Sequence, residues 1–198
     1  MMHRGNNFGQ CIRLIAVIAS LCSLPAFADD YDPVNQLLRD GQLQQAMVKA
    51  DAYLAQNPRD PQMRFLKALI QQDGGQRDAA IASYVALTQD YPELPEPYNN
   101  VAVLYAARGD FEKARDALEM ATRNSRSYAT AHENLGDVYA RLAEKSYRQA
   151  LQIDAGNTTL APKLTLIRQL INAPAAARLA PFPGPTAPPA NTTPAAKK

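Results

Sequence analysis

The stretch PEPYNNVAVLYAARGDFEKARDALEMATRNS, residues 95–125, predicts two short amphipathic helices joined by a turn that contains glycine. In the first helix, apolar side chains recur every three or four residues and so share one helix face: Tyr98, Val101, Ala102 and Tyr105. Gly109 interrupts this period, and a second apolar stripe follows at Phe111, Ala114, Leu118 and Ala121. Neither helix is long enough to be stable alone. Since a hairpin of this size cannot bury both of its apolar sides, it requires neighbouring hairpins.

The neighbouring hairpins are indicated by residues that recur with a fixed period. Three glycines are evenly spaced along the chain, at Gly41, Gly75 and Gly109. Three alanines keep the same spacing, at Ala46, Ala80 and Ala114. Pro58 and Pro92 are separated by the same interval, and each follows the end of a predicted hairpin, where a proline cannot continue a helix. The sequence therefore predicts at least three copies of one helical unit.

The period and its markers resemble the tetratricopeptide repeat (TPR) family, whose repeats are about 34 residues long and begin W-x2-L-G-x2-Y. The third copy reads Y-x2-V-A-x2-Y from Tyr98, and the next copy reads H-x2-L-G-x2-Y from His132. The resemblance covers roughly residues 31–155. It implies an all-α protein, a right-handed α-solenoid of about three to four TPR hairpins with a C-terminal capping helix.

The expected domain organisation has three parts: a leader at 1–28, a repeat domain at 29–172 and a Pro/Ala-rich tail at 173–198 that is expected to be disordered. Within the repeat domain the sequence predicts repeats at about 31–58, 61–92 and 95–126, a shortened repeat at 129–155 and a capping helix at 158–172.

The fourth repeat is predicted to lack its turn. Tyr139 and Tyr147 are only eight positions apart, whereas the corresponding Tyr105 and Leu118 in the third repeat are thirteen positions apart. The missing residues are the turn and the start of the second helix, and no glycine or proline stands between Tyr139 and Tyr147. We therefore expect one long helix from about Thr130 to Ile153.

Three prolines precede the apolar stripe of the third repeat, at Pro92, Pro95 and Pro97. Because proline disfavours helix in itself and in the residue before it, we expect a stiff, non-helical connection as far as Tyr98. The alternative is that this proline-rich connection is itself a ligand for a groove elsewhere.

Residues 1–28 have the pattern of a secretory signal peptide. A basic segment leads into an apolar run at residues 14–24, and small residues stand at Ala26 and Ala28. We therefore expect cleavage after Ala28 and a periplasmic or secreted protein. One alternative is a membrane anchor, although the apolar run of about eleven residues is shorter than the ~20 that span a bilayer. The other is a lipoprotein signal that uses Cys22.

Composition excludes several classes of function. Both cysteines, Cys11 and Cys22, lie in the leader, so the mature chain would have no disulfide, no catalytic thiolate and no cysteine metal site. Of the 21 basic residues, two lie in the leader and three in the tail, which leaves 16 against 19 acidic residues in the helical body. A body with no excess of basic residues does not favour nucleic-acid binding.

No catalytic or cofactor-binding motif is present. His132, the one histidine of the mature chain, occupies a slot that is usually a packing position in the family. The Gly74-Gly75 pair is not a phosphate loop, since it is not followed directly by a lysine and then a serine or threonine. No serine has a Gly-x-Ser-x-Gly context. We therefore expect no enzyme activity, no cofactor and no metal.

The resemblance instead implies a protein-binding groove on the first helix of each repeat. On the face opposite the packing stripe, this gives the candidates Glu96, Asn99, Val103, Thr130, Glu133, Asp137 and Arg141. Asn100 and Asn134 are one period apart at the usual asparagine slot of the family and could bond either backbone or ligand. Because Glu133 and Asp137 are acidic, the expected ligand is an extended peptide or partner helix with some basic character.

The resulting functional hypothesis is an exported repeat scaffold that binds protein or peptide partners in a bacterial cell envelope. Similarity to periplasmic repeat proteins suggests envelope assembly, peptidoglycan remodelling or division as its setting. The alternatives are a chaperone-like carrier of exported proteins and an accessory subunit of an envelope enzyme.

Overall fold

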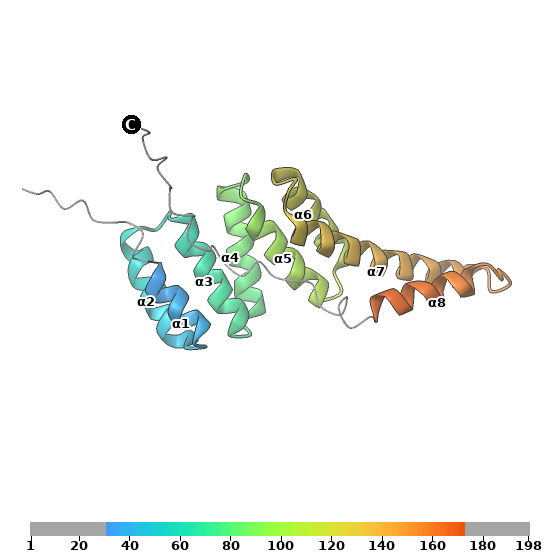
Figure 1. Cartoon of the computed structure of the whole chain (residues 1–198), viewed down its shortest axis with the longest axis horizontal. Helices are drawn as coiled ribbons and strands as arrows, with labels where there is room; N and C mark the ends of the chain where they lie inside the picture. The colour runs from blue at the N-terminus through green and yellow to red at the C-terminus, as the bar shows by residue number, and fades with distance from the viewer. Residues whose placement is uncertain (1–30, 173–198) are drawn as a thin grey trace, which may run out of the picture.

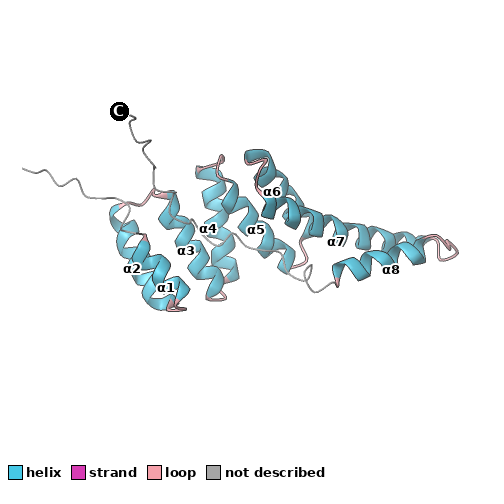
Figure 2. Cartoon of the chain, viewed as in Figure 1, coloured by secondary structure: helices cyan, strands magenta, loops and turns pink. Residues whose placement is uncertain are grey.

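The computed structural model describes residues 31–172, and within them the chain forms eight α-helices and no strand (Figures 1 and 2). The predicted signal peptide at 1–28 and the predicted tail at 173–198 lie outside the described residues. The expected all-α solenoid is confirmed. The helices are α1 (Asp32–Arg39), α2 (Leu43–Gln56), α3 (Pro61–Asp73), α4 (Arg77–Asp90), α5 (Pro95–Ala107), α6 (Phe111–Asn124), α7 (Ala129–Ile153) and α8 (Leu160–Ile171).

Each helix packs on the next one along the chain, so that α1 to α6 form a row of three antiparallel hairpins (Figure 1). The buried apolar clusters bridge these hairpins rather than lying inside them. One cluster joins α3, α4 and α5 through Phe65, Tyr84 and Val101, and another joins α5, α6 and α7 through Ala102, Leu118 and Val138. Each hairpin therefore depends on its neighbour for burial of its apolar side, as expected for a repeat array.

The three periodic glycines occupy equivalent turns. Gly41, Gly75 and Gly109 have φ angles of 70°, 74° and 83°, and no other described residue has a positive φ. Each is the second residue after the end of the first helix of a hairpin. The left-handed backbone conformation is readily accessible only to glycine, which explains why this residue keeps the period.

We expect Gly109→Ala to destabilise the protein and Gly136→Ala to stabilise it. A Cβ would meet nothing within 4 Å at either position, so neither substitution causes a clash. At Gly109, with φ of 83°, alanine would carry the cost of the left-handed region, roughly 1–2 kcal/mol. Gly136 lies inside α7, where alanine is favoured over glycine by roughly 0.5–1 kcal/mol. Urea unfolding curves of both variants measure this, and shifts of the same sign would contradict it.

The fourth repeat has no turn, as predicted. Helix α7 runs unbroken for 25 residues, and α8 folds back along it, so that the pair extends away from the row of hairpins (Figure 1). Buried Leu160 and Leu164 lie on α8, and two polar contacts join the helices: the Arg168 Nε to Glu144 Oε1 distance is 3.2 Å, and the Lys163 ammonium lies 5.9 Å from the ring centroid of Tyr147.

The expected non-helical connection before Tyr98 is wrong. Helix α5 begins at Pro95, so that Pro95 and Pro97 both lie in its first turn, and only Pro92 stands outside. The first N–H groups of a helix have no partner within the helix. A proline is therefore tolerated in this turn, and its fixed φ is already close to the helical value.

Candidate functional site

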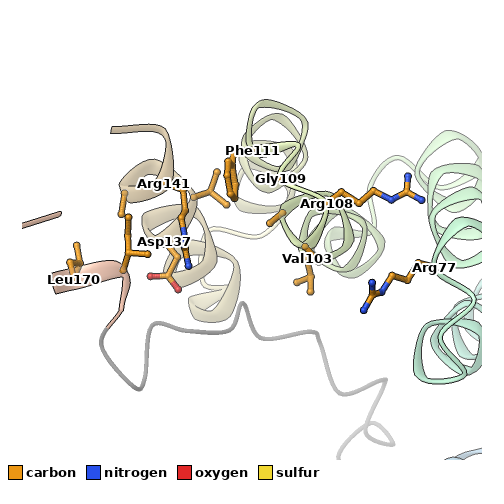
Figure 3. Close-up of a pocket in the computed structure, with 13 residues that line it drawn as sticks. Arg77, Val103, Arg108, Gly109, Phe111, Asp137, Arg141 and Leu170 are labelled. Carbon is orange, nitrogen blue, oxygen red and sulfur yellow. The ribbon is translucent and has the colours of Figure 1, made fainter. Parts of the chain in front are cut away.

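An open groove of about 750 Å³ lies between the third repeat and the α7–α8 pair (Figure 3). We call it the α5–α8 groove. It is lined by Arg77, Val103, Ala106, Ala107, Arg108, Gly109, Phe111, Asp137, Val138, Ala140, Arg141, Leu170 and Ile171.

The shortened fourth repeat shapes this groove. The end of α5 and the turn at Gly109 form one wall, and residues 137–141 of α7 form the other. A regular repeat would turn near residue 143, one period after Gly109. Because α7 continues instead, α8 can return along it and bring Leu170 and Ile171 to the edge of the groove.

The lining is partly apolar. Val103 and Phe111 are half-buried, and Figure 3 shows both between the α4 side and the α7 side of the groove. Leu170 is 54% exposed although it is a large apolar side chain. Such a surface suits an apolar side chain of a bound polypeptide, which would remove these groups from water.

Basic groups outnumber acidic ones in the groove, with three arginines and one aspartate. Arg108 forms an ion pair with Asp78 of α4, whereas Arg77 forms no ion pair with any residue of 31–172. Figure 3 shows Arg77 and Arg108 on the α4 side and Asp137 with Arg141 on the α7 side. This balance is opposite to the acidic character expected for the groove, and it disfavours a basic partner.

Asp137 is the one carboxylate of the lining. Partial burial raises the pKa of its carboxyl group, Glu133 one turn earlier raises that pKa further, and Arg141 lowers it. Glu133 itself is exposed and lies outside the lining. The acidic pair on α7 is therefore only partly directed into the groove.

The predicted groove residues divide into three sets. Val103, Asp137 and Arg141 line the α5–α8 groove, as the face opposite the packing stripe predicts. Glu96, Thr130 and Glu133 are at least partly exposed near the starts of α5 and α7, outside this lining. The third set is wrong as groove residues, because its members are buried: Asn99, Asn100 and Asn134.

The three asparagines form a hydrogen-bonded chain between helices. Asn134 Nδ2 donates to Asn99 Oδ1 at 2.8 Å, Asn99 Nδ2 to Asn100 Oδ1 at 3.2 Å, and Asn100 Nδ2 to the Tyr84 hydroxyl at 3.1 Å. Their side chains are 0–1% exposed. The chain links α4, α5 and α7, and it satisfies polar groups that would otherwise be costly to bury. These residues hold the walls of the groove in place rather than contacting a ligand.

Sequence reasoning missed several groove residues, above all Arg77 and Arg108. Arg77 lies two residues after Gly75 and Arg108 directly before Gly109, so both flank a periodic turn. Basic residues beside two successive turns could have indicated that this edge of the repeat array forms part of a groove. No pattern in the sequence indicated that α8 would line the groove, because this depends on where α8 packs.

His132 is not a packing residue, contrary to expectation. It is exposed near the start of α7, with Nε2 at 3.2 Å from the carbonyl oxygen of Arg126. Across residues 31–172, no group of three or more His, Cys, Asp or Glu side chains is arranged to hold a metal ion. Nor does this part of the chain contain a helix with the length and apolarity needed to span a membrane.

Stacked helical hairpins that repeat with a constant period place the chain among the α-solenoid repeat proteins. No known family profile matches the sequence, and no curated protein matches it either. Solved structures do match. A thermophilic TPR protein from Thermus thermophilus has a TM-score of 0.54 and 24% identity, covering 72% of this chain and 81% of its own.

Two further solved structures are also similar to the chain. The MamA protein has a TM-score of 0.53 and 19% identity over 71% of this chain and 79% of its own. A tetratricopeptide repeat protein from Parabacteroides merdae has a TM-score of 0.52 and 20% identity over 71% of this chain and 57% of its own. The chain therefore has the tetratricopeptide repeat fold, which confirms the resemblance read from its period.

Proposed function

We propose that this chain is a scaffold that binds other proteins through the α5–α8 groove. The observation that carries the proposal is the groove itself, an open, partly apolar surface bordered by charged side chains at the ends of α4 and α5 and in the middle of α7. Such a surface can accept an extended polypeptide, with the apolar groups providing affinity and the charged groups selecting the sequence. A shallow site of this kind suits moderate affinity.

The proposed place of action is the periplasm of a bacterial cell envelope. The support is the leader at residues 1–28, with its basic start, short apolar run and small residues before the predicted cleavage site. Envelope assembly, peptidoglycan remodelling or division would be the setting of such a scaffold. The location and mass of the chain in fractionated cells test this step, since a periplasmic chain without residues 1–28 is expected and an intact cytoplasmic chain would contradict it.

Crosslinking in cells tests the binding function. We expect a photoreactive amino acid at position 107 to capture one abundant partner, because Ala107 is exposed and lines the groove. The matched control is position 52, where Ala52 is also exposed but lies on α2, outside the groove. Many different adducts at position 107 would instead support a chaperone-like carrier. Equal capture at both positions, or capture at neither, would contradict binding through the groove.

A further inference from the structure

We infer that the α5–α8 groove selects an acidic segment of its partner protein, an extended peptide in which Asp or Glu side chains stand beside apolar ones. This inference rests on the proposed function and specifies the chemistry of the partner. Arg77 and Arg141, on opposite sides of the groove, would pair with carboxylates of the ligand, and Val103 with Leu170 would contact its apolar side chains.

Charge complementarity carries the argument. The lining has three guanidinium groups and one carboxylate. Arg108 is already paired with Asp78, and Arg141 lies near enough to Asp137 to lower the pKa of that carboxyl group. Arg77 has no such partner within residues 31–172, and Figure 3 shows its side chain extending from α4 toward the groove. A carboxylate arriving between the two walls would therefore meet a net positive field.

The position of Arg77 has no evident structural reason. It is the first residue of α4, where the positive end of the helix dipole favours acidic side chains and disfavours a cation. It also forms no ion pair within 31–172 that would compensate for this cost. A ligand carboxylate could interact with the guanidinium group and with the helix end together.

The apolar part of the lining indicates which side chains the ligand carries beside its acidic ones. Leu170 is 54% exposed. Together with half-buried Val103 it offers contacts to apolar side chains in an open groove. An extended segment that carries acidic and apolar residues on both of its faces would satisfy both walls, since successive side chains point to opposite sides.

The chain's own C-terminal residues are a poorer occupant. Residues 173–198 follow directly after the groove residue Ile171 and its neighbour Asn172, but their charged side chains are all basic: Arg178, Lys197 and Lys198. They contain no Asp or Glu. A segment of this charge would be repelled by Arg77 and Arg141, so a separate acidic partner fits better.

A selection from a random peptide library tests the inference. The purified full chain is immobilised and challenged with phage-displayed random peptides, and the recovered sequences are compared with those recovered by the Arg77→Glu variant. We expect peptides rich in Asp or Glu together with apolar residues. For a synthetic peptide of the most enriched sequence, we expect Arg77→Glu to weaken binding by roughly tenfold, since an attraction becomes a repulsion. Binding should also weaken at high salt.

Arg59→Glu is the matched control. It makes the same charge change at an exposed arginine in the loop between α2 and α3, outside the groove, and should alter affinity less than about twofold. Arg77→Glu itself should fold normally, because an acidic residue is favoured at a helix start, and circular dichroism checks this. Arg141→Gln gives a second, independent loss of binding from the α7 wall.

Other outcomes overturn the inference. Enriched basic peptides would do so, as would acidic peptides whose binding is insensitive to both Arg77→Glu and Arg141→Gln. Enrichment of basic Pro/Ala-rich peptides would point to the chain's own residues 173–198. In each of these cases a single partner crosslinked at position 107 would leave the scaffold function standing. If crosslinking and selection both fail at the groove, the proposed function fails as well.

Discussion

Tyr84→Ala is expected to lower the free energy of unfolding by about 3–5 kcal/mol, which is a large part of the stability of a domain of this size. Tyr84 is a large side chain with 0% exposure, and it packs against Phe65 with ring centroids 5.5 Å apart. Alanine would leave a cavity between α3, α4 and α5 and would remove the acceptor of the Asn100 hydrogen bond. Urea unfolding followed by circular dichroism measures the loss.

Two further substitutions separate the causes of this loss. Tyr139→Ala makes the same change at a tyrosine that is 47% exposed and hydrogen-bonded to Glu119, so it should cost less than about 1 kcal/mol. Tyr84→Phe keeps the ring and removes the hydroxyl, and should cost about 1 kcal/mol. A loss for Tyr84→Ala no greater than that for Tyr139→Ala would show that the clusters between repeats do not stabilise the array.

The repeat architecture could be predicted because local rules determine it. Gly41, Gly75 and Gly109 each need a left-handed backbone, and the alanines of the packing stripe need close helix contact. Both requirements can be predicted from the type of residue and its spacing along the chain. The long α7 could be predicted for the same reason, since a turn would need residues that are missing between Tyr139 and Tyr147.

The groove could be predicted only in part. Val103, Asp137 and Arg141 follow from the face of the first helix in a repeat. Arg77 and Leu170 do not, because they come from α4 and α8 and meet the others only when α8 packs back along α7. Periodicity shows which face of a helix is buried, whereas it does not show which helix ends converge.

The asparagines show a second limit of sequence reasoning. A polar residue on the face opposite an apolar stripe is expected to be exposed. Asn99 is buried nevertheless, because α7 covers this face of α5 and provides Asn134 as a hydrogen-bond partner. Recurrence at one period marked Asn100 and Asn134 as important, but it did not distinguish a binding role from a structural one.

Asn99→Ala is expected to destabilise the protein by about 1–3 kcal/mol, because it removes one partner from a buried hydrogen-bonded chain. Asn124 provides the control: its Nδ2 also donates between repeats, to the Pro92 carbonyl oxygen at 2.6 Å, but the side chain is exposed. Water can replace that bond, so Asn124→Ala should cost less than about 1 kcal/mol. The difference between the two variants measures the effect of burial on an asparagine contact.

A double-mutant cycle of Asn99→Ala and Asn134→Ala then isolates the bond between α5 and α7. The Asn134 Nδ2 to Asn99 Oδ1 distance is 2.8 Å and both side chains are buried, so we expect a coupling energy of about 1 kcal/mol. Helix α7 carries Asp137 and Arg141, and this bond fixes its distance from Val103 on α5. Asn99→Ala should therefore also weaken groove binding, although Asn99 itself contacts no ligand. A coupling energy near zero would mean that apolar contacts alone place α7, and that the width of the groove does not depend on the asparagines.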